Sequence, residues 1–575
     1  MMLSPIYTEK TRCQDCYKCV RQCPVKAIQV NDGSAVVRHD LCIFCGRCIE
    51  VCPVNAKKLR SDTARAKQMI ELNSQVWVSL APSFPAEFQA SKSAVISALK
   101  RLGFSGVSET SVGARIISDR ISARMKKGDK KIISSACPTV KELIRKYQPD
   151  LVPYLSDLVS PLHAHADYLK KDFGESIKVV FIGPCISKKL EADDENNPVD
   201  LALTFLELKN WLQEEKIMLI EPAEEEFFYP EGRGNAAEFA IEGGMLNTIK
   251  KNVTTVDAGF ISFSGITNIR DTFQDIADIA ENENVFLEYL ACDGGCISGK
   301  GMTSKGSYLK RRLDVLNYHQ NCSNKVENCF DKITDLLVIE QKITAEPIAN
   351  SRHSEKNIIE VLSSLEKFSA EDEINCSGCG YNSCRDFAAA VFDGKAEKSM
   401  CVTHMRKIAE KKSNALMKAL PLGVVITDSR KKILECNQKF ITSFSDIDLE
   451  MTEKMERQIA GLDLDTFIPD TGLFTRIQTS ENSMLEGKLQ YKKKVFRMFV
   501  FRIGQEKMIG AIFQDITSPA VRRETIIRKT EEVIEKNLKS VQQIASLLGE
   551  NAAETQLILN SLIETYYQAP DGENR

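Results

Sequence analysis

The chain has 575 residues, with 76 lysines and arginines against 79 aspartates and glutamates, which leaves a net charge of −3 when histidine is neutral. At roughly 150 residues per domain this length predicts about four domains. A hydrophobic content of 43% with 27% charged residues excludes fibrous and wholly disordered classes. The near-zero net charge gives no reason to expect nucleic acid or an anionic membrane as a partner.

Cysteine is the unusual residue of this chain. There are 19, in groups: eight before residue 53, four between residues 137 and 296, and four between residues 376 and 401. No stretch approaches the roughly 18 consecutive apolar residues of a membrane helix, and the polar start Met1–Arg12 has no signal-peptide core. We therefore expect a cytoplasmic, reducing location, where grouped cysteines indicate metal or redox chemistry rather than disulfides.

The first eight cysteines form two copies of one motif, C-x2-C-x2-C-x3-C-P. The first copy is Cys13, Cys16, Cys19, Cys23 and Pro24, and the second is Cys42, Cys45, Cys48, Cys52 and Pro53. In such runs the fourth cysteine ligates the other cluster. This predicts one [4Fe–4S] cluster on Cys13, Cys16, Cys19 and Cys52, and a second on Cys42, Cys45, Cys48 and Cys23. Zinc is the alternative, although its sites usually have two C-x2-C pairs. Residues 5–58 resemble a bacterial two-cluster ferredoxin domain, which implies one-electron transfer by a domain spanning residues 1–60.

The chain then changes to alternating apolar strands and helices. Residues 60–75 predict a connecting helix, followed by a strand at Val76–Leu80 and a helix at Ser91–Leu102. Lys131–Ser134 and Val179–Ile182 are further short strands, and each ends in a loop that carries a cysteine. This alternation is typical of an α/β sheet with its chemistry at the strand ends.

Three cysteine loops define the central domain, predicted at residues 76–342: Ser134-Ser-Ala-Cys-Pro-Thr-Val140, Gly183-Pro-Cys-Ile-Ser-Lys-Lys189 and Ala291-Cys-Asp-Gly-Gly-Cys-Ile297. Together, in this order after a double ferredoxin motif, they resemble the cluster-binding motifs of the [FeFe]-hydrogenase large-subunit domain. The resemblance implies a [4Fe–4S] cubane on Cys137, Cys185, Cys292 and Cys296. It also implies a thiolate at Cys296 that bridges to a diiron subsite, and an ammonium at Lys188 that hydrogen-bonds a cyanide ligand there. The alternative is a set of buried cysteines without metal.

One position departs from that family. Its members usually have two adjacent cysteines in the first loop, of which one ligates iron and the other relays protons, whereas here the neighbour of Cys137 is Ala136. A methyl group has no ionisable proton, so the usual relay is interrupted, although water can substitute for a thiol. Thr139 and Leu290 also replace residues usual in the family. Rapid hydrogen turnover is therefore not expected, and the chain resembles the divergent, sensory branch.

A third cysteine module is predicted at residues 357–412, after a polar linker. Its motif is Cys376-x2-Cys379-x4-Cys384, followed by a helix and then Cys401, and it resembles a small four-cysteine Fe–S module of anaerobic redox proteins. The resemblance predicts a further [4Fe–4S] cluster, with zinc as the alternative. Gly378 and Gly380 would let the backbone fold closely around the cluster. His404 is expected at the surface, because four cysteines already saturate the site.

The last part of the chain is poor in cysteine. Strands at residues 422–427 and 432–436, a helix opened by Asn437, and three alternating segments ending in Phe513-Gln-Asp-Ile-Thr517 resemble a PAS domain at residues 413–517. No histidine lies between residues 413 and 520 to bind haem, so we favour a dimerising or signal-transmitting PAS domain without cofactor. Heptad spacing predicts a coiled coil at residues 519–567, used to transmit a signal or only to dimerise.

Three cysteines remain, Cys322, Cys329 and Cys436, and each is expected to be an inert buried thiol. The acidic run Asp193–Glu195 is expected to be a solvated loop. His163 and His165 are candidates for proton carriers near the central site, with lower weight than an ordinary structural role.

The predicted fold class is an α/β multidomain chain with a ferredoxin-type α+β domain, a hydrogenase-like α/β domain, a small Fe–S module, a PAS α+β domain and a C-terminal coiled coil. The leading hypothesis is an iron–sulfur redox or hydrogen sensor from an anaerobe, a homodimer through its PAS and coiled-coil parts. A ferredoxin-like redox protein and a separate output protein would be its partners, with no role for nucleic acid or membrane. A catalytically active [FeFe]-hydrogenase and a plain electron-transfer subunit are the alternatives.

Overall fold

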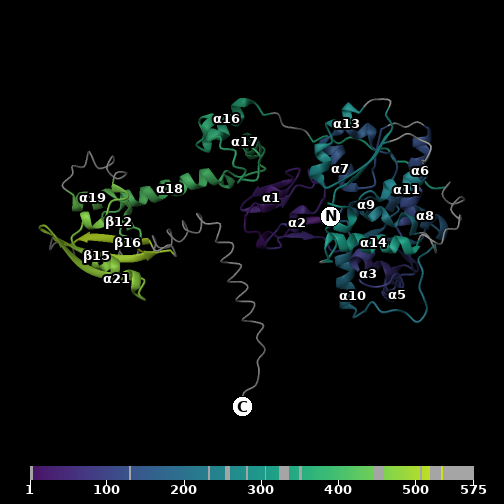
Figure 1. Cartoon of the computed structure of the whole chain (residues 1–575), viewed down its shortest axis with the longest axis horizontal. Helices are drawn as coiled ribbons and strands as arrows, with labels where there is room; N and C mark the ends of the chain where they lie inside the picture. The colour runs from purple at the N-terminus through teal and green to yellow at the C-terminus, as the bar shows by residue number, and fades with distance from the viewer. Residues whose placement is uncertain are drawn as a thin grey trace, which may run out of the picture. The chain divides into compact units, whose positions relative to one another are not determined.

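The computed structural model describes residues 4–127, 131–230, 234–252, 259–279, 283–304, 306–322, 336–348, 353–445, 459–504, 508–517 and 533–534. The chain divides into two compact units, residues 1–400 and 401–575, which are described separately (Figure 1). The predicted coiled coil at residues 519–567 lies outside the described residues apart from 533–534. Within the described part, no helix is long and apolar enough to cross a membrane.

The N-terminal part of the first unit is small and built from two hairpin-like sheets. Strand β1 (Ile6–Thr8) pairs antiparallel with β4 (Lys57–Leu59), and β2 (Ile28–Asn31) pairs antiparallel with β3 (Ser34–Val37). Two short helices, α1 (Lys18–Gln22) and α2 (Arg47–Glu50), carry the ends of the two cysteine motifs. The residue before each helix has a left-handed backbone, Tyr17 at φ 55° and Gly46 at φ 74°. The repeated sequence motif therefore folds twice into the same turn.

The central part contains two parallel sheets rather than the one sheet suggested by the alternation of elements. The four-stranded sheet has the order β6 (Gly106–Glu109), β5 (Val76–Leu80), β8 (Lys178–Gly183), β9 (Leu201–Thr204). The three-stranded sheet has the order β10 (Gly259–Ser264), β11 (Val285–Leu290), β7 (Lys131–Ile133). Strands β9 and β11 are buried along their whole length, as expected for parallel strands covered on both faces.

Helices surround both sheets (Figure 1). They are α3 (Thr63–Leu72), α4 (Phe84–Glu87), α5 (Lys92–Arg101), α6 (Ser111–Lys127), α7 (Pro138–Tyr147), α8 (Pro161–Phe173), α9 (Lys188–Asp193), α10 (Phe205–Glu214), α11 (Gly244–Asn252), α12 (Ile266–Asp271), α13 (Asp275–Asp278) and α14 (Tyr308–Cys322). The predicted elements at residues 60–75, Val76–Leu80 and Ser91–Leu102 are confirmed by α3, β5 and α5. Helix α5 begins after Ser91, whose hydroxyl accepts the N–H of Ala94 and satisfies a free donor of the first turn.

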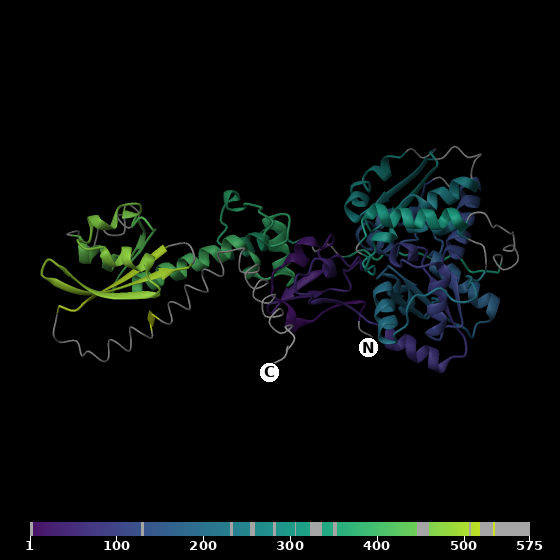
Figure 2. The same ribbon diagram turned by 60° about the horizontal axis from the view of Figure 1, so that its bottom comes forward.

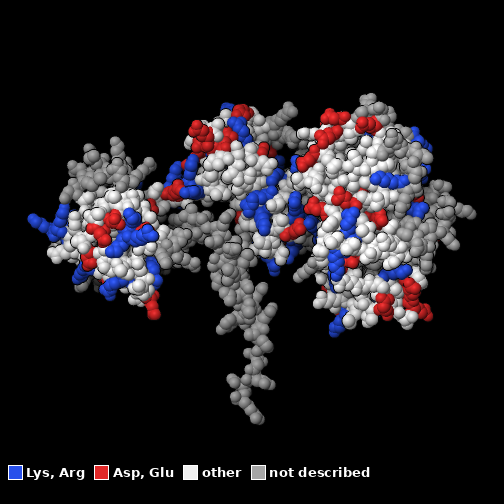
Figure 3. All heavy atoms as spheres, viewed as in Figure 1, with Lys and Arg blue, Asp and Glu red and all other residues white. Residues whose placement is uncertain are grey.

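The first unit ends with the small module. It consists of α16 (Glu355–Ser364) packed on α17 (Cys384–Phe392), with the motif Cys376-x2-Cys379-x4-Cys384 in the loop that leads into α17. Short 3-10 turns at Ala370–Asp372 and Lys398–Met400 flank these helices. On the face shown in Figure 3, acidic and basic side chains are intermixed, in keeping with the small net charge.

The second unit begins with the long helix α18 (Val402–Ala419) and continues as one antiparallel sheet (Figure 2). The strand order is β13 (Ile433–Cys436), β12 (Gly423–Thr427), β16 (Met508–Asp515), β15 (Lys494–Ile503), β14 (Met484–Tyr491). Helices α19 (Gln438–Phe444) and α21 (Gly472–Thr479) bury their phenylalanines in the core of this sheet. The predicted strands, and the helix capped by Asn437, are confirmed.

A buried ionic network joins the cysteine-rich part to the central sheet. Lys189 on α9 has no exposed surface, and its ammonium donates to Asp62 Oδ2 at 2.7 Å and to Glu207 Oε1 at 2.9 Å. Burial alone would raise the pKa of Asp62, but the neighbouring Lys189 and Arg60 hold it below its usual value. Arg60 also binds Asp193 through two hydrogen bonds of 2.8 and 2.9 Å. The expectation that Asp193 belongs to a solvated loop is therefore wrong, because a sequence run does not show which cation reaches it.

We predict that Lys189→Met destabilises the central domain by about 3–5 kcal/mol, because it removes the buried cation that pairs with Glu207 and one of the cations that pair with Asp62. Both tryptophans of the chain, Trp77 and Trp211, lie in this domain, so urea unfolding followed by tryptophan fluorescence reports on it alone. Lys171→Met is the matched control, since Lys171 pairs with Glu175 on the exposed surface, where such pairs contribute little to stability. Equal unfolding midpoints for the two variants would contradict the structural role of Lys189.

Candidate metal centres

The first group of thiols is Cys13, Cys16, Cys19 and Cys52. The Cys19 side chain interacts electrostatically with the other three, so one member from the second motif joins three from the first. Burial raises the pKa of Cys19 to about 11. Backbone N–H groups of Ala35 and Ala56 donate to the sulfurs of Cys13 and Cys52, at 3.5 and 3.2 Å. Such hydrogen bonds help to set the reduction potential of an iron–sulfur cluster.

The second group is Cys23, Cys42, Cys45 and Cys48. Cys48 interacts with the other three, and burial raises the pKa of Cys42 to about 12 and that of Cys45 to about 11. The N–H groups of Ala27 and Phe44 donate to the sulfurs of Cys23 and Cys42, at 3.2 and 3.3 Å. The structure thus brings together the two crossed groups that the sequence motif predicts. Thiols this deeply buried become thiolates at neutral pH only beside a strong positive charge, which metal ligation supplies.

The geometry of these groups bears on the zinc alternative. Among the residues that the structure describes, no group of three cysteine, histidine or carboxylate side chains is placed to hold a single metal ion. A four-iron cluster keeps its thiolates farther apart than one zinc ion does, because each thiolate binds a different iron. This absence does not decide between a cluster and zinc, and the preference for a cluster rests on the doubled C-x2-C-x2-C motif.

The third group is Cys137, Cys185, Cys292 and Cys296, and it lies where strands of both parallel sheets end. Cys137 follows β7 and precedes α7, Cys185 follows β8, and Cys292 follows β11. Cys292 interacts electrostatically with the other three, and burial raises the pKa of Cys185 to about 11. The two sheets together therefore gather the four thiols that the three sequence loops supply separately.

A cavity of about 110 Å³ lies against this group, and its wall includes Cys137, Cys185 and Cys296. Lys188 and Ala136 also line it, as does Leu290. The Lys188 ammonium is 2.7 Å from Glu191 Oε2, which also accepts a hydrogen bond from Ser160 at 2.9 Å. The predicted site residues of the central domain thus line one cavity, and the Lys188 cation stands at its wall beside a carboxylate.

Glu288 is a residue of this cavity that sequence reasoning missed. It is buried in β11, and its carboxylate accepts the N–H groups of Gly243 and Met245 at 2.9 and 3.1 Å. Burial raises the pKa of Glu288 to about 7. The sequence feature that could have pointed to Glu288 is a single carboxylate in the otherwise apolar strand Val285–Leu290, four residues before Cys292.

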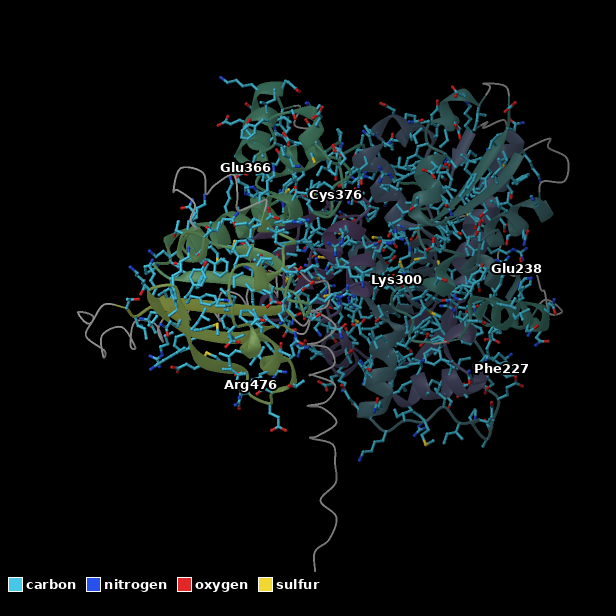
Figure 4. All side chains as sticks on the ribbon, turned by 60° about the vertical axis from the view of Figure 1, so that its left-hand side comes forward. Phe227, Glu238, Lys300, Glu366, Cys376 and Arg476 are labelled. Carbon is cyan, nitrogen blue, oxygen red and sulfur yellow. The ribbon has the colours of Figure 1, made fainter. Side chains whose placement is uncertain are left out.

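The cysteines of the small module fall in both units. Cys376 is exposed and Cys379 and Cys384 are half-buried, and the N–H of Cys384 donates to Asn375 Oδ1 at 2.7 Å, which closes the loop. Figure 4 labels Cys376 on this loop. Cys401 is buried and immediately precedes α18, in the second unit. Its participation with the other three in one cluster stays a prediction.

The candidate proton carriers His163 and His165 are not among the residues that line the central cavity. His165 is fully buried, and its two ring nitrogens are 2.8 Å from Ser79 Oγ and 2.6 Å from Ser108 Oγ. Burial lowers the pKa of His165 to about 3, so this ring stays neutral. Burial also lowers the pKa of His163. The expectation of a surface position for His404 is wrong, since only 9% of the residue is exposed.

The spare cysteines are only partly described. Cys436 is buried in the core of the second unit, as expected for an inert thiol. Cys322 ends α14, and the structure does not describe its side chain, while Cys329 lies outside the described residues.

Three family models match the chain. Residues 74–300 match the model of the iron only hydrogenase large subunit, C-terminal domain. Residues 5–53 match a 4Fe-4S dicluster domain, and residues 372–403 match an Fe–S cluster module. The central domain is hydrogenase-like. The flanking segments match iron–sulfur cluster domains, so the chain combines a hydrogenase-like domain with two segments of iron–sulfur type.

The relatives are distant. Iron hydrogenase 1 of Clostridium pasteurianum is 25% identical over 270 residues, which cover 38% of this chain and 47% of that protein. The NADP-reducing hydrogenase subunit HndD of Solidesulfovibrio fructosivorans is 22% identical over 401 residues, which cover 60% of this chain and 65% of that protein. The chain thus spans less than two thirds of either relative. One solved structure is a variant of [FeFe]-hydrogenase HydA1 from Chlamydomonas reinhardtii, with 18% sequence identity and a TM-score of 0.42. The match covers 50% of this chain and 100% of the HydA1 chain.

We predict that Cys185→Ala lowers the iron content by about four atoms per chain, because a cubane that loses one of four thiolates is poorly held. Iron analysis and low-temperature EPR of the purified full chain measure this loss. Cys436→Ala is the control, since it also removes a buried thiol but one in the core of the second unit. An unchanged iron content in Cys185→Ala would contradict a cluster at the central cysteines.

Proposed function

We propose that this chain is an iron–sulfur redox sensor, with hydrogen as one candidate signal, in which a hydrogenase-like domain is coupled to a PAS and coiled-coil transmitter. The sixteen cysteines of the predicted groups would hold four [4Fe–4S] clusters, and Cys296 would connect the central cluster to a diiron subsite. When bound, these groups would supply one-electron transfer and hydrogen chemistry. The residues of the chain determine how electrons and protons reach them.

The observation that carries the proposal is the methyl group of Ala136 in the wall of the central cavity. Proton transfer needs an ionisable group within hydrogen-bond reach of the reacting atom. Ala136 offers none, and its N–H donates instead to Ser134 Oγ at 3.3 Å. A site that binds its ligand but transfers protons slowly is suited to sensing rather than to turnover.

The ferredoxin-type part lies directly against the central centre, which supports electron exchange between them. Ser187 Oγ donates to Phe44 O at 3.0 Å, so the loop after Cys185 contacts the second cysteine motif. Cys45 and Cys137 pack against one hydrophobic cluster. Lys300, on the loop after Cys296 and labelled in Figure 4, pairs with Glu50 of α2 at 2.7 Å. The shared contacts provide a short path between the two groups of thiols.

The second unit offers a route for transmitting a change of cluster state. Helix α18 starts directly after Cys401, a predicted cluster ligand, and ends at the five-stranded sheet. Asn437 Nδ2 donates to Met417 O in the last turn of α18 at 3.1 Å, and to Leu422 O at 2.8 Å. One residue therefore connects the helix to the first strand, in a sheet of the kind expected for a PAS domain. The output protein, the homodimer and the ferredoxin-like electron partner stay predictions.

A specific observation also favours the competing function, an active [FeFe]-hydrogenase. Glu288 lines the same cavity and, because burial raises its pKa to about 7, it can take up and release protons near neutral pH. A plain electron-transfer subunit is the third candidate, but it leaves the second unit without a role.

Infrared spectroscopy of the chain matured with the diiron assembly machinery tests the proposal. We expect metal-bound CO and CN stretches together with hydrogen turnover far below that of hydrogenases. Absence of these bands would limit the function to redox sensing or electron transfer. Turnover at hydrogenase rates would refute the sensor and favour the enzyme.

We predict that Ala136→Cys raises residual hydrogen turnover, by about 10²–10⁴-fold if relay is the limiting step, because a thiol restores an ionisable group at the cavity wall. Hydrogen evolution with a chemical reductant measures the rate. Ala136→Ser is the control, since its hydroxyl is similar in size but does not ionise in this pH range. If both variants turn over at the wild-type rate, the proton-relay argument for Ala136 is wrong.

A further inference from the structure

The cysteine loop of the small module is docked on the ferredoxin-type domain within the first unit. Arg21 Nη1 donates to Gly378 O at 3.2 Å, and Lys26 Nζ donates to Gly380 O at 2.6 Å. A second pair of contacts lies at the other end of the module, where Gln29 Nε2 donates to Gly394 O at 2.9 Å and the N–H of Val30 donates to Lys395 O at 2.9 Å. The module is therefore held by hydrogen bonds at both ends of α17, to backbone carbonyls whose positions its fold determines.

Gly380 is required by this docking rather than only by the fold of its own loop. Its φ is +95°, and a Cβ there would lie 3.0 Å from Val20 and 3.1 Å from the backbone nitrogen of Arg21. Both neighbours belong to α1, the helix between Cys19 and Cys23. Besides the room for a cluster that the sequence predicts, this glycine therefore admits the ferredoxin helix.

The Lys26 cation lies at the interface between the two domains. Its ammonium interacts electrostatically with Cys23 of the ferredoxin-type domain and with Cys379 of the module. It is held by three carbonyl oxygens, those of Val20 at 3.3 Å, Arg21 at 3.2 Å and Gly380 at 2.6 Å. The buried Tyr381 side chain interacts with the same two cysteines. Lys26 and Tyr381 therefore both lie within electrostatic reach of Cys23 and of Cys379.

We infer that this interface is an electron-transfer junction, in which the module cluster at Cys379 exchanges electrons with the ferredoxin cluster at Cys23 and Lys26 adjusts both potentials. The inference rests on the cluster assignments made under the proposed function. One electron leaves a reduced cluster and reduces the oxidised one, so no bond changes and no other reactant is needed. The module cluster then connects the two clusters of the ferredoxin-type domain to the segment that leads into α18, rather than acting as an isolated structural cluster.

An EPR-monitored redox titration of the full chain tests the role of Lys26. A nearby cation stabilises the more negative, reduced state of a cluster, so Lys26→Met should lower two midpoint potentials together. The two signals are assigned by their loss in Cys379→Ser and in Cys48→Ser. Lys18→Met is the matched control, because it removes an equal charge from an exposed position of the neighbouring helix α1 and should move both potentials less.

Gly380→Ala tests the docking itself. We expect loss of the magnetic interaction between the module and ferredoxin clusters in the fully reduced chain, with iron content unchanged. Gly394→Ala is the control, since Gly394 also has a left-handed backbone, at φ +67°, but nothing within 4 Å of its Cβ position.

An unchanged interaction in Gly380→Ala, or a shift of only one potential in Lys26→Met, would overturn the junction. If the iron content of the wild-type chain is too low to include a cluster in the module, the cluster assignment is refuted instead. Failure of the junction and failure of the cluster assignment are therefore distinguishable.

Discussion

The position of the central group of cysteines relative to the ferredoxin-type domain depends on one buried cation, Lys189. Lys189 is neutralised by Asp62, in the segment that leaves the ferredoxin-type domain, and by Glu207, at the start of α10. Because an uncompensated charge is very costly inside a protein, these three groups must stay together. Lys189 lies four residues after Cys185, so the network holds the second cysteine loop in place as well. The segment between the domains is therefore anchored at the point where its position affects the metal centre.

Within the first unit, the ferredoxin-type domain has links to both of the other groups of cysteines. The second ferredoxin group packs against the hydrophobic cluster that also contacts Cys137. On another side, Cys23 approaches the module loop at Cys379 across Lys26. The ferredoxin-type domain is thus central rather than terminal in the electron path we propose. Electrons can pass from it in two directions, toward the cavity that contains Ala136 and toward the module that precedes α18.

Local patterns predicted much of this arrangement because they depend on neighbours in the chain. The left-handed residues at Tyr17 and Gly46 repeat because the motif repeats. Parallel strands were predictable as short apolar runs, since they are buried on both faces. The expectations that are wrong depend on distant partners. Asp193 is expected to be solvated, but Arg60 lies beside it, and His404 is expected at the surface, but it is buried. Glu288 was overlooked because a single carboxylate in a strand has no spacing to recognise.

The sequence by itself determined the chemistry of this protein. Sixteen cysteines at cluster spacing, and an alanine at position 136, are facts of the chain that need no fold to be recognised. Only the tertiary structure decided that two sheets and not one bring the central four cysteines together, and that Gly380 admits a helix of another domain. The physical reason is the distance along the chain between the residues that interact. Ligand type and spacing are encoded within a few residues, whereas burial, charge compensation and contact between domains arise from residues hundreds of positions apart.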